Sequence, residues 1–161
     1  MSIPVVLLTG YLGAGKTTVL NRLLTAPWVR DQSPALVINE FGRCGVDGKL
    51  IEDDRVRTYE INKGSLFCTC TQHQWVQAMG EIASDGTTGV VLIESTGIAE
   101  TRNLEGSLAL PALASAFRLQ ANLCVVDAVN FVKVAAVLAI AAAQVRWADG
   151  LLITKGDQVP A

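Results

Sequence analysis

The chain has 161 residues, of which half are hydrophobic and 17% are charged, and its formal net charge is −2. A chain of this length and hydrophobic content can form one domain with a substantial core. The charge balance offers no basic surface of the kind that binds nucleic acid or an anionic membrane. We therefore expect a single globular α/β domain over residues 1–161 that uses neither nucleic acid nor a membrane as a partner.

The four cysteines, Cys44, Cys68, Cys70 and Cys124, are too few for a disulfide framework in a chain of this length. The N-terminus leads directly into an apolar run, without a basic segment or a cleavage site. The alanine-rich run at residues 134–143 is shorter than the roughly 20 residues that a bilayer requires, so we interpret it as a packed helix. These features predict a cytoplasmic protein with reduced thiols.

Apolar runs bounded by turn residues predict buried strands at residues 4–8, 35–38, 89–93, 123–126 and 151–153. Helices are expected at residues 16–24 and 72–83, within 111–119, and at 128–143 with an interruption near Lys133. This alternation predicts a three-layer α/β fold with a mostly parallel sheet between helices. Ligands in such sheets bind at the carboxyl ends of the strands. The polar segment 41–59 is expected to form a mobile or partner-facing loop.

The first predicted strand leads into a phosphate-binding pattern. Residues 10–18 read G-Y-L-G-A-G-K-T-T, which satisfies G-x-x-x-x-G-K-[ST] at the start of a predicted helix. Glycines let the backbone N–H groups fold around a phosphate, and the helix directs its positive end towards it. We expect Lys16 to neutralise the β and γ phosphates and the Thr17 hydroxyl to hold Mg²⁺. The predicted nucleotide-binding residues here are Gly10, Gly13, Ala14, Gly15, Lys16, Thr17 and Thr18.

The sequence E-S-T-G at residues 94–97 places a carboxylate and a glycine where a strand ends opposite the phosphate loop. We expect Glu94 to position Mg²⁺ or water and the Gly97 amide to lie near the γ phosphate. Triphosphate hydrolysis depends on charge stabilisation and alignment of water more than on covalent chemistry. The alternative is an acidic strand end before a helix-capping serine or threonine. The predicted catalytic residues are Lys16, Thr17, Glu94 and Gly97.

The sequence T-K-G-D at residues 154–157 comes directly after the last predicted strand and resembles N-K-x-D, the guanine-reading motif of GTPases. The Asp157 carboxylate can accept hydrogen bonds from the N1–H and the 2-amino group of guanine, two donors that adenine lacks. The aliphatic stem of Lys155 can lie over the ring. Thr154 replaces the usual asparagine, which braces neighbouring loops, and its hydroxyl can make only part of that network. A polar surface turn is the alternative interpretation.

Together these motifs resemble those of the CobW-type GTPases, a P-loop family of metallochaperones. The matching stretches are V-V-L-L-T-G-Y-L-G-A-G-K-T-T-V-L-N-R-L-L near the start, N-E-F-G at 39–42 with G-V-D at 45–47, E-S-T-G-I-A-E at 94–100, V-V-D-A at 125–128, and A-D at 148–149. The resemblance runs through nearly the whole chain. It implies the three-layer P-loop NTPase fold, with GTP and Mg²⁺ as ligands and slow GTP hydrolysis. It also implies delivery of a transition metal, commonly zinc or cobalt, to a client protein.

The resemblance also implies further elements after the guanine motif. Members of the family usually continue into the rest of the GTPase domain and then into a smaller C-terminal domain. We therefore expect this chain to lack the last elements of its GTPase domain and the whole C-terminal domain. An uncovered sheet edge or apolar face would favour self-association, for example as a homodimer.

A transition-metal site is implied after Gly64, where the family carries Cys-x-Cys-Cys and this chain reads G-S-L-F-C-T-C-T. Aligned on Gly64, only Cys68 matches, Ser65 and Phe67 replace two of the family's thiols, and Cys70 is an additional thiol. If the alignment is shifted to match Cys68 and Cys70, the adjacent third cysteine is still missing. Zinc favours four donors, with thiolates and imidazoles preferred, so we expect Cys68, Cys70 and His73 to be ligands and Glu40 to approach from the adjacent loop. Glu40 is also the candidate link between the metal and the γ phosphate. The alternative is that the cysteines are half-buried packing residues and that His73 and Glu40 are solvated.

Two other functions stay open at the level of the sequence. A P-loop kinase would transfer the γ phosphate to a small acceptor instead of water, and the T-K-G-D motif argues against it. A nucleotide-regulated binding module would use the region around Cys68 to contact a partner protein without holding a metal. The loss of two family thiols keeps this second interpretation open.

Overall fold

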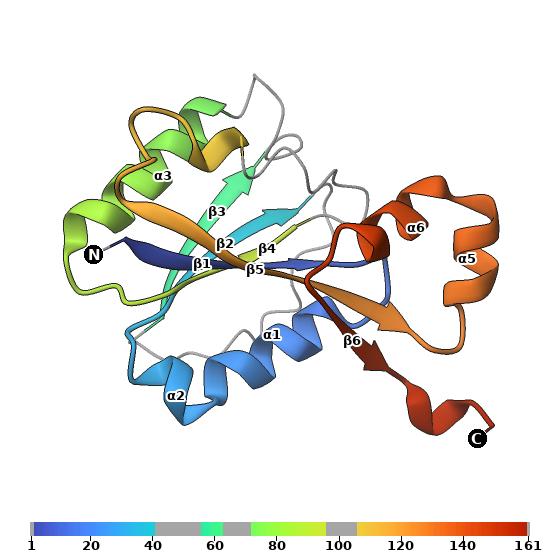
Figure 1. Ribbon diagram of the computed structural model, residues 1–161. Helices are drawn as coiled ribbons and strands as arrows, with labels where there is room; N and C mark the ends of the chain where they lie inside the picture. Colours follow the sequence, from blue (N-terminus) through green and yellow to red (C-terminus); the bar gives the residue numbers. More distant parts are fainter. Residues whose placement is uncertain (1, 41–55, 63–71, 96–105, 161) are drawn as a thin grey trace.

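The computed structural model describes residues 2–40, 56–62, 72–95 and 106–160. Within them, parallel strands form one sheet in the order β3-β2-β4-β1-β5-β6 (Figure 1). The strands are β1 (Ile3–Thr9), β2 (Ala35–Glu40), β3 (Arg57–Asn62), β4 (Val91–Glu94), β5 (Phe117–Asp127) and β6 (Gly150–Thr154). The predicted parallel sheet is confirmed, and β1, which leads into the phosphate loop, lies in its interior.

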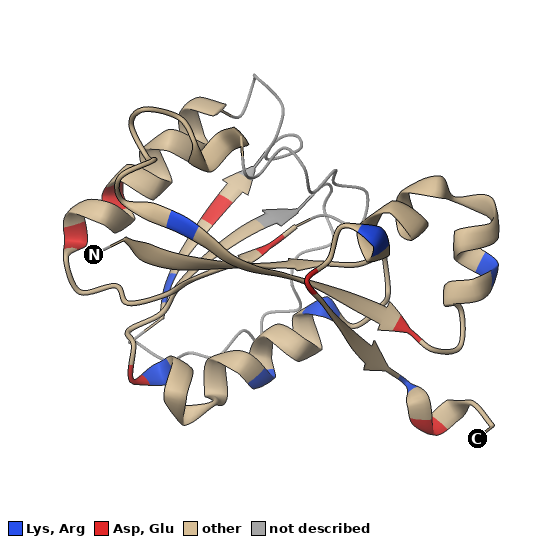
Figure 2. Cartoon of the chain, in the orientation of Figure 1, with Lys and Arg blue, Asp and Glu red and all other residues tan. Residues whose placement is uncertain are grey.

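Helices lie on both faces of this sheet (Figure 1). They are α1 (Lys16–Thr25) and α2 (Pro27–Arg30) on one face, and α3 (Gln72–Asp85), α5 (Phe131–Val137) and α6 (Ala139–Arg146) on the other, and a short 3₁₀ helix, η1 (Gly156–Gln158), comes after β6. In the part of the chain that the structure describes, no helix is both long enough and apolar enough to cross a bilayer. Figure 2 shows basic and acidic residues spread over several helices and strands.

The core is divided by the sheet into two apolar layers. Successive side chains of a strand point to opposite faces, so Val37 of β2 packs in one layer with Trp75 and Met79 of α3. Its neighbour Leu36 packs in the other layer with Leu20 of α1. A strand that is buried on both faces must be apolar throughout, which explains why the interior strands read as continuous apolar runs.

The helix predicted within residues 111–119 is wrong. Residues 111–116 form a series of turns, and Phe117 begins β5 instead of ending a helix. The strand extends this far because Phe117 pairs with Ile3 of β1, and its ring is buried in the core layer beneath α3. Long-range pairing and burial therefore override the helix propensity of an alanine-rich segment.

Other boundaries also differ from the prediction. The helical interruption lies at Leu138, between α5 and α6, and not near Lys133. The loop predicted over residues 41–59 ends earlier, because Arg57 begins β3, while residues 41–55 lie outside the described residues. Strand β3 was not predicted, because its sequence, R-T-Y-E-I-N, is mostly polar and gives no apolar run. Such a sequence suits its place at the edge of the described sheet.

Candidate functional site

The phosphate loop, residues 10–15, connects the carboxyl end of β1 to the first residue of α1. Gly10, Gly13 and Gly15 have φ angles of +133°, +76° and +93°, which L side chains rarely adopt. A Cβ on Gly10 would also overlap the carbonyl oxygen of Val125 in the neighbouring strand. The glycines of the motif therefore allow the loop to turn tightly against the sheet while α1 begins immediately after it.

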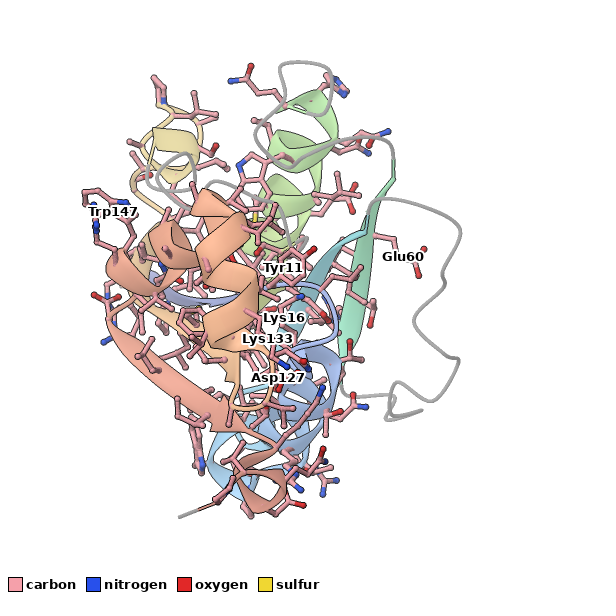
Figure 3. All side chains as sticks on the ribbon, turned by 90° about the vertical axis from the view of Figure 1, so that its right-hand side faces the viewer. Tyr11, Lys16, Glu60, Asp127, Lys133 and Trp147 are labelled. Atoms are coloured by element: carbon pink, nitrogen blue, oxygen red, sulfur yellow. The ribbon has the colours of Figure 1, made fainter. Side chains whose placement is uncertain are left out.

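Lys16 is buried, and its ammonium group is held inside the loop. Its Nζ donates to the carbonyl oxygen of Gly10 at 2.9 Å and lies 3.4 Å from that of Tyr11. Figure 3 shows Tyr11 and Lys16 near one another beside the carboxyl ends of the strands. The first N–H groups of a helix have no partner within the helix, so a fixed cation and a helix N-terminus meet at this loop. Such an arrangement binds anions.

Thr17 and Glu94 are brought together as predicted. The Thr17 hydroxyl donates to Oε1 of Glu94 at 3.1 Å, although the two residues are far apart in the sequence. Glu94 is buried at the end of β4, in register with Leu8 of β1, and the Ser95 hydroxyl donates to the Leu8 carbonyl at 3.2 Å. Hydroxyl and carboxylate oxygens are ligands that Mg²⁺ prefers, so this pair fits the ion. Gly97 lies outside the described residues.

The T-K-G-D motif lies against the phosphate loop. The Thr154 hydroxyl is 2.7 Å from the carbonyl oxygen of Ala14 and 3.2 Å from that of Val126. A hydroxyl has one proton, so Thr154 donates to one carbonyl at a time, and the shorter contact is the one to the phosphate loop. Asp157 lies in η1, where it is exposed to solvent. Thr154 thus braces the phosphate loop, and the Asp157 carboxylate is accessible to a ligand.

Lys155 makes a second connection to the phosphate loop. Its Nζ donates to the carbonyl oxygen of Gly13 at 3.0 Å and forms an ion pair with Oδ2 of Asp127 at 2.8 Å. The hydrogen bond from Lys155, followed by that from Asn130, holds the pKa of Asp127 at about 2. Neither Asp127 nor Asn130 belongs to the residues predicted from the sequence to bind the nucleotide. The available signal was an aspartate at the carboxyl end of β5, next to the strand that carries T-K-G-D.

A cavity of about 300 Å³ opens beside the phosphate loop. Its wall is formed by the first half of the loop, the end of β5, and helices α5 and α6, and Figure 3 labels three of its residues, Tyr11, Asp127 and Lys133. Apolar side chains such as Val126 and Val134 alternate with these polar groups. The phosphate loop therefore borders this cavity on one side and contacts the T-K-G-D motif on another.

The predicted transition-metal ligands are not tested by the described structure. Cys68 and Cys70 lie outside the described residues, as does the side chain of Glu40, and His73 is exposed in the first turn of α3. Among the residues that are described, there is no group of three or more His, Cys, Asp or Glu side chains that could hold a metal. Cys44 also lies outside the described residues, whereas Cys124 is buried in β5, where desolvation raises the pKa of its thiol. It is a core residue.

Comparison with known proteins agrees with this geometry. "Zinc chaperone CobW" of Pseudomonas aeruginosa is 33% identical over 135 residues, which cover 78% of this chain and 35% of that protein. "Zinc chaperone YjiA" of Escherichia coli is 31% identical over 161 residues, which cover 96% of this chain and 50% of that protein. The chain thus spans half or less of the length of these relatives.

A solved structure and a family match complete the comparison. The crystal structure of Zn(II)-bound YjiA GTPase from E. coli superposes with a TM-score of 0.72 at 28% identity, covering 98% of this chain and 51% of that one. The predicted three-layer P-loop NTPase fold is thereby confirmed. Residues 4–161 match the family described as "CobW/HypB/UreG, nucleotide-binding domain". The chain belongs to the CobW/HypB/UreG family, and the part of that family that it matches is the nucleotide-binding domain.

Proposed function

We propose that this chain binds GTP with Mg²⁺ and hydrolyses it slowly, and that this cycle serves delivery of a transition metal, zinc or cobalt, to a client protein. The observation that carries the proposal is the direct contact between the two nucleotide motifs. Thr154 and Lys155 of the base motif are hydrogen-bonded to the carbonyls of Ala14 and Gly13 in the phosphate loop. A base and its phosphates would thus be bound by one connected unit.

Each part of the nucleotide has a residue suited to it. Lys16 and the N-terminus of α1 would bind the β and γ phosphates, and Thr17 and Glu94 would hold Mg²⁺, which supplies charge neutralisation when it is bound. Lys155 would lie over the base and the exposed Asp157 would accept from guanine. A site of this kind stabilises charge and aligns water without a covalent intermediate. Slow hydrolysis is the expected result when the domain acts alone.

The metal part of the proposal rests on the family and on the sequence. Curated relatives are named zinc chaperones, and a solved neighbour is a Zn(II)-bound GTPase. In this chain, Cys68, Cys70 and His73 would supply thiolate and imidazole donors, and Glu40 would complete the set. Glu40 ends β2, next to the strand that ends in Glu94, so it would connect the metal to the nucleotide.

The test is calorimetric binding of non-hydrolysable GTP and ATP analogues with Mg²⁺, with and without one equivalent of zinc. We expect the chain to prefer the guanine nucleotide and Asp157→Ala to weaken that binding at least about tenfold, because it removes two hydrogen bonds to a charged acceptor. Asp31→Ala, which removes an exposed carboxylate beyond α2, is the matched control and should change nothing. We expect Cys68→Ser with Cys70→Ser to abolish zinc binding, and Cys124→Ala to preserve it.

Each contrary result points to a different function. Equal binding of both nucleotides would contradict guanine recognition. With hydrolysable GTP or ATP in place of the analogues, phosphorylation of a small acceptor with release of the nucleoside diphosphate would identify a kinase. Zinc binding that is unchanged in the double cysteine variant would remove the proposed metal site and favour a nucleotide-regulated binding module.

A further inference from the structure

The unexplained feature of the site is the ion pair between Asp127 and Lys155. Asp127 closes β5 and Lys155 comes directly after β6, and the register of the two strands pairs Asp127 with Thr154. The pairing continues beyond the strands, since the Ala128 N–H donates to the Thr154 carbonyl at 3.0 Å. The carboxylate is thus placed beside the base motif by the sheet itself.

Lys155 needs such a partner if it is to cover a base. A lysine side chain has four rotatable bonds and loses much conformational entropy when it is fixed in one orientation. Its ammonium group has three protons, and the structure shows acceptors for two of them, the Gly13 carbonyl at 3.0 Å and the Asp127 carboxylate at 2.8 Å. With both ends of the side chain anchored, its aliphatic stem is fixed beside the phosphate loop.

Asp127 is itself held rigidly by the turn that it begins. Its Oδ1 accepts the N–H of Val129 at 2.9 Å and lies 3.3 Å from the N–H of Asn130. Its Oδ2 accepts the side-chain amide of Asn130 at 2.8 Å as well as the Lys155 ammonium. Only 11% of the Asp127 side chain is exposed, so solvent competes weakly for these hydrogen bonds. The carboxylate is therefore a fixed anchor and not a surface charge that meets a lysine by chance.

We propose that Asp127, supported by Asn130, is the positioning residue that fixes Lys155 between the phosphate loop and the bound guanine base. The proposal rests on the proposed GTP binding of the same site. It assigns a function to a residue outside both nucleotide motifs. Without the carboxylate, the Lys155 ammonium would lose the Asp127 hydrogen bond and keep the one to the Gly13 carbonyl. Its side chain could then move away from the base.

The experiment is a double-mutant cycle on GTP-analogue binding, measured by calorimetry with Asp127→Asn, Lys155→Met and the combined variant. Asp127→Asn keeps the shape and an oxygen acceptor for the Val129 N–H but removes the charge that holds Lys155. We expect it to raise the Kd for GTP about tenfold. Because Asp127 acts through Lys155, the combined variant should bind no more weakly than Lys155→Met alone. Asn130→Ala should weaken binding in the same direction and to a smaller extent.

Asp149→Asn is the matched control. Its carboxylate also accepts a backbone N–H, that of Asn122 at 2.7 Å, at the other end of the β5–β6 pair. This variant should leave the Kd within about twofold of the unmodified chain. If Asp127 only capped its turn, the loss caused by Asp127→Asn would multiply that of Lys155→Met, and the proposal would be overturned. An unmodified chain without guanine preference would instead contradict the proposed function.

Urea unfolding of the same four proteins without nucleotide gives a second measurement. An energetic coupling between Asp127 and Lys155 in the free chain is expected if the pair is formed before the ligand arrives. Independent, additive effects of the two substitutions on the unfolding midpoint would overturn the claim that the lysine is positioned in advance.

Discussion

Glycine residues of the phosphate loop all have positive φ angles, but they differ in what surrounds them. Gly10 and Gly13 both have positive φ angles, of +133° and +76°. A side chain at Gly10 would meet the backbone of Val125, whereas nothing lies within 4 Å of the corresponding position at Gly13. The motif therefore requires glycine at Gly10 for two reasons and at Gly13 for one, because only Gly10 is also restricted by space.

Gly10→Ala and Gly13→Ala separate these two requirements. We expect Gly10→Ala to lower the free energy of unfolding by about 3 kcal/mol, since backbone strain and an overlap with β5 add together. Gly13→Ala should cost about 1 kcal/mol from backbone strain alone. Urea unfolding measures both values. Equal losses would show that the Val125 contact relaxes without cost and that only the backbone conformation matters.

At the scale of the element, α1 is the helix that presents the phosphate-binding loop. It has no side-chain cap at its N-terminus, where Gly15 is the capping residue. Its position depends on buried apolar contacts, chiefly those of Leu20 and Leu24 with the sheet. Arg22 in the last turn lies where a cation interacts favourably with the helix dipole. Packing, and not capping, therefore fixes the helix against the strands.

Leu20→Ala tests this dependence. Leu20 is fully buried, so its truncation leaves a cavity beneath α1 and should cost about 3 kcal/mol of unfolding free energy. Val132→Ala on α5 is the comparison, because Val132 is 79% exposed and its truncation should cost less than about 0.5 kcal/mol. Chemical denaturation measures both. A small loss for Leu20→Ala would mean that the loop contacts, and not the core, hold α1.

The elements that could be predicted from the sequence are those with the most buried side chains. Strands such as β1 and β4, covered on both faces, were recognisable as apolar runs, and motif order placed Thr17 near Glu94 correctly. Edge strand β3 was missed because its described side chains are mostly exposed, and only Ile61 among them is buried. The role of Asp127 depends on strand register and on a side-chain ion pair, which no local pattern reveals.

At the scale of the molecule, the described sheet ends in two edges, β3 and β6. On β6, Leu152 packs against the core, while Leu151 and Ile153 are 48% and 60% exposed. An edge strand with exposed apolar side chains is a template for pairing with another chain. We therefore expect this chain to associate with itself through β6 as its concentration rises.

Leu151→Lys should suppress that association. A lysine on the edge strand adds charge and removes apolar surface, which opposes edge-to-edge pairing. Sedimentation measured over a range of concentrations should show the unmodified chain growing heavier and Leu151→Lys remaining monomeric. Val132→Lys, which places the same charge on exposed α5, should behave like the unmodified chain. A monomeric unmodified chain, or an equal effect of the two lysines, would contradict association through β6.

The position of β1 in the interior of the sheet has a consequence for how the chain is made. Among the described strands β1 comes first in the sequence, but it pairs with β4 and β5, so the pairing of Val5 with Val91 and of Leu8 with Leu123 forms only after those later strands are made. The brace from Thr154 to Ala14 comes later still. Parallel pairing between such distant segments is slow. The phosphate loop is therefore translated well before the segments that complete it, and during that interval the apolar side chains of newly made β1 are uncovered and open to binding by a chaperone.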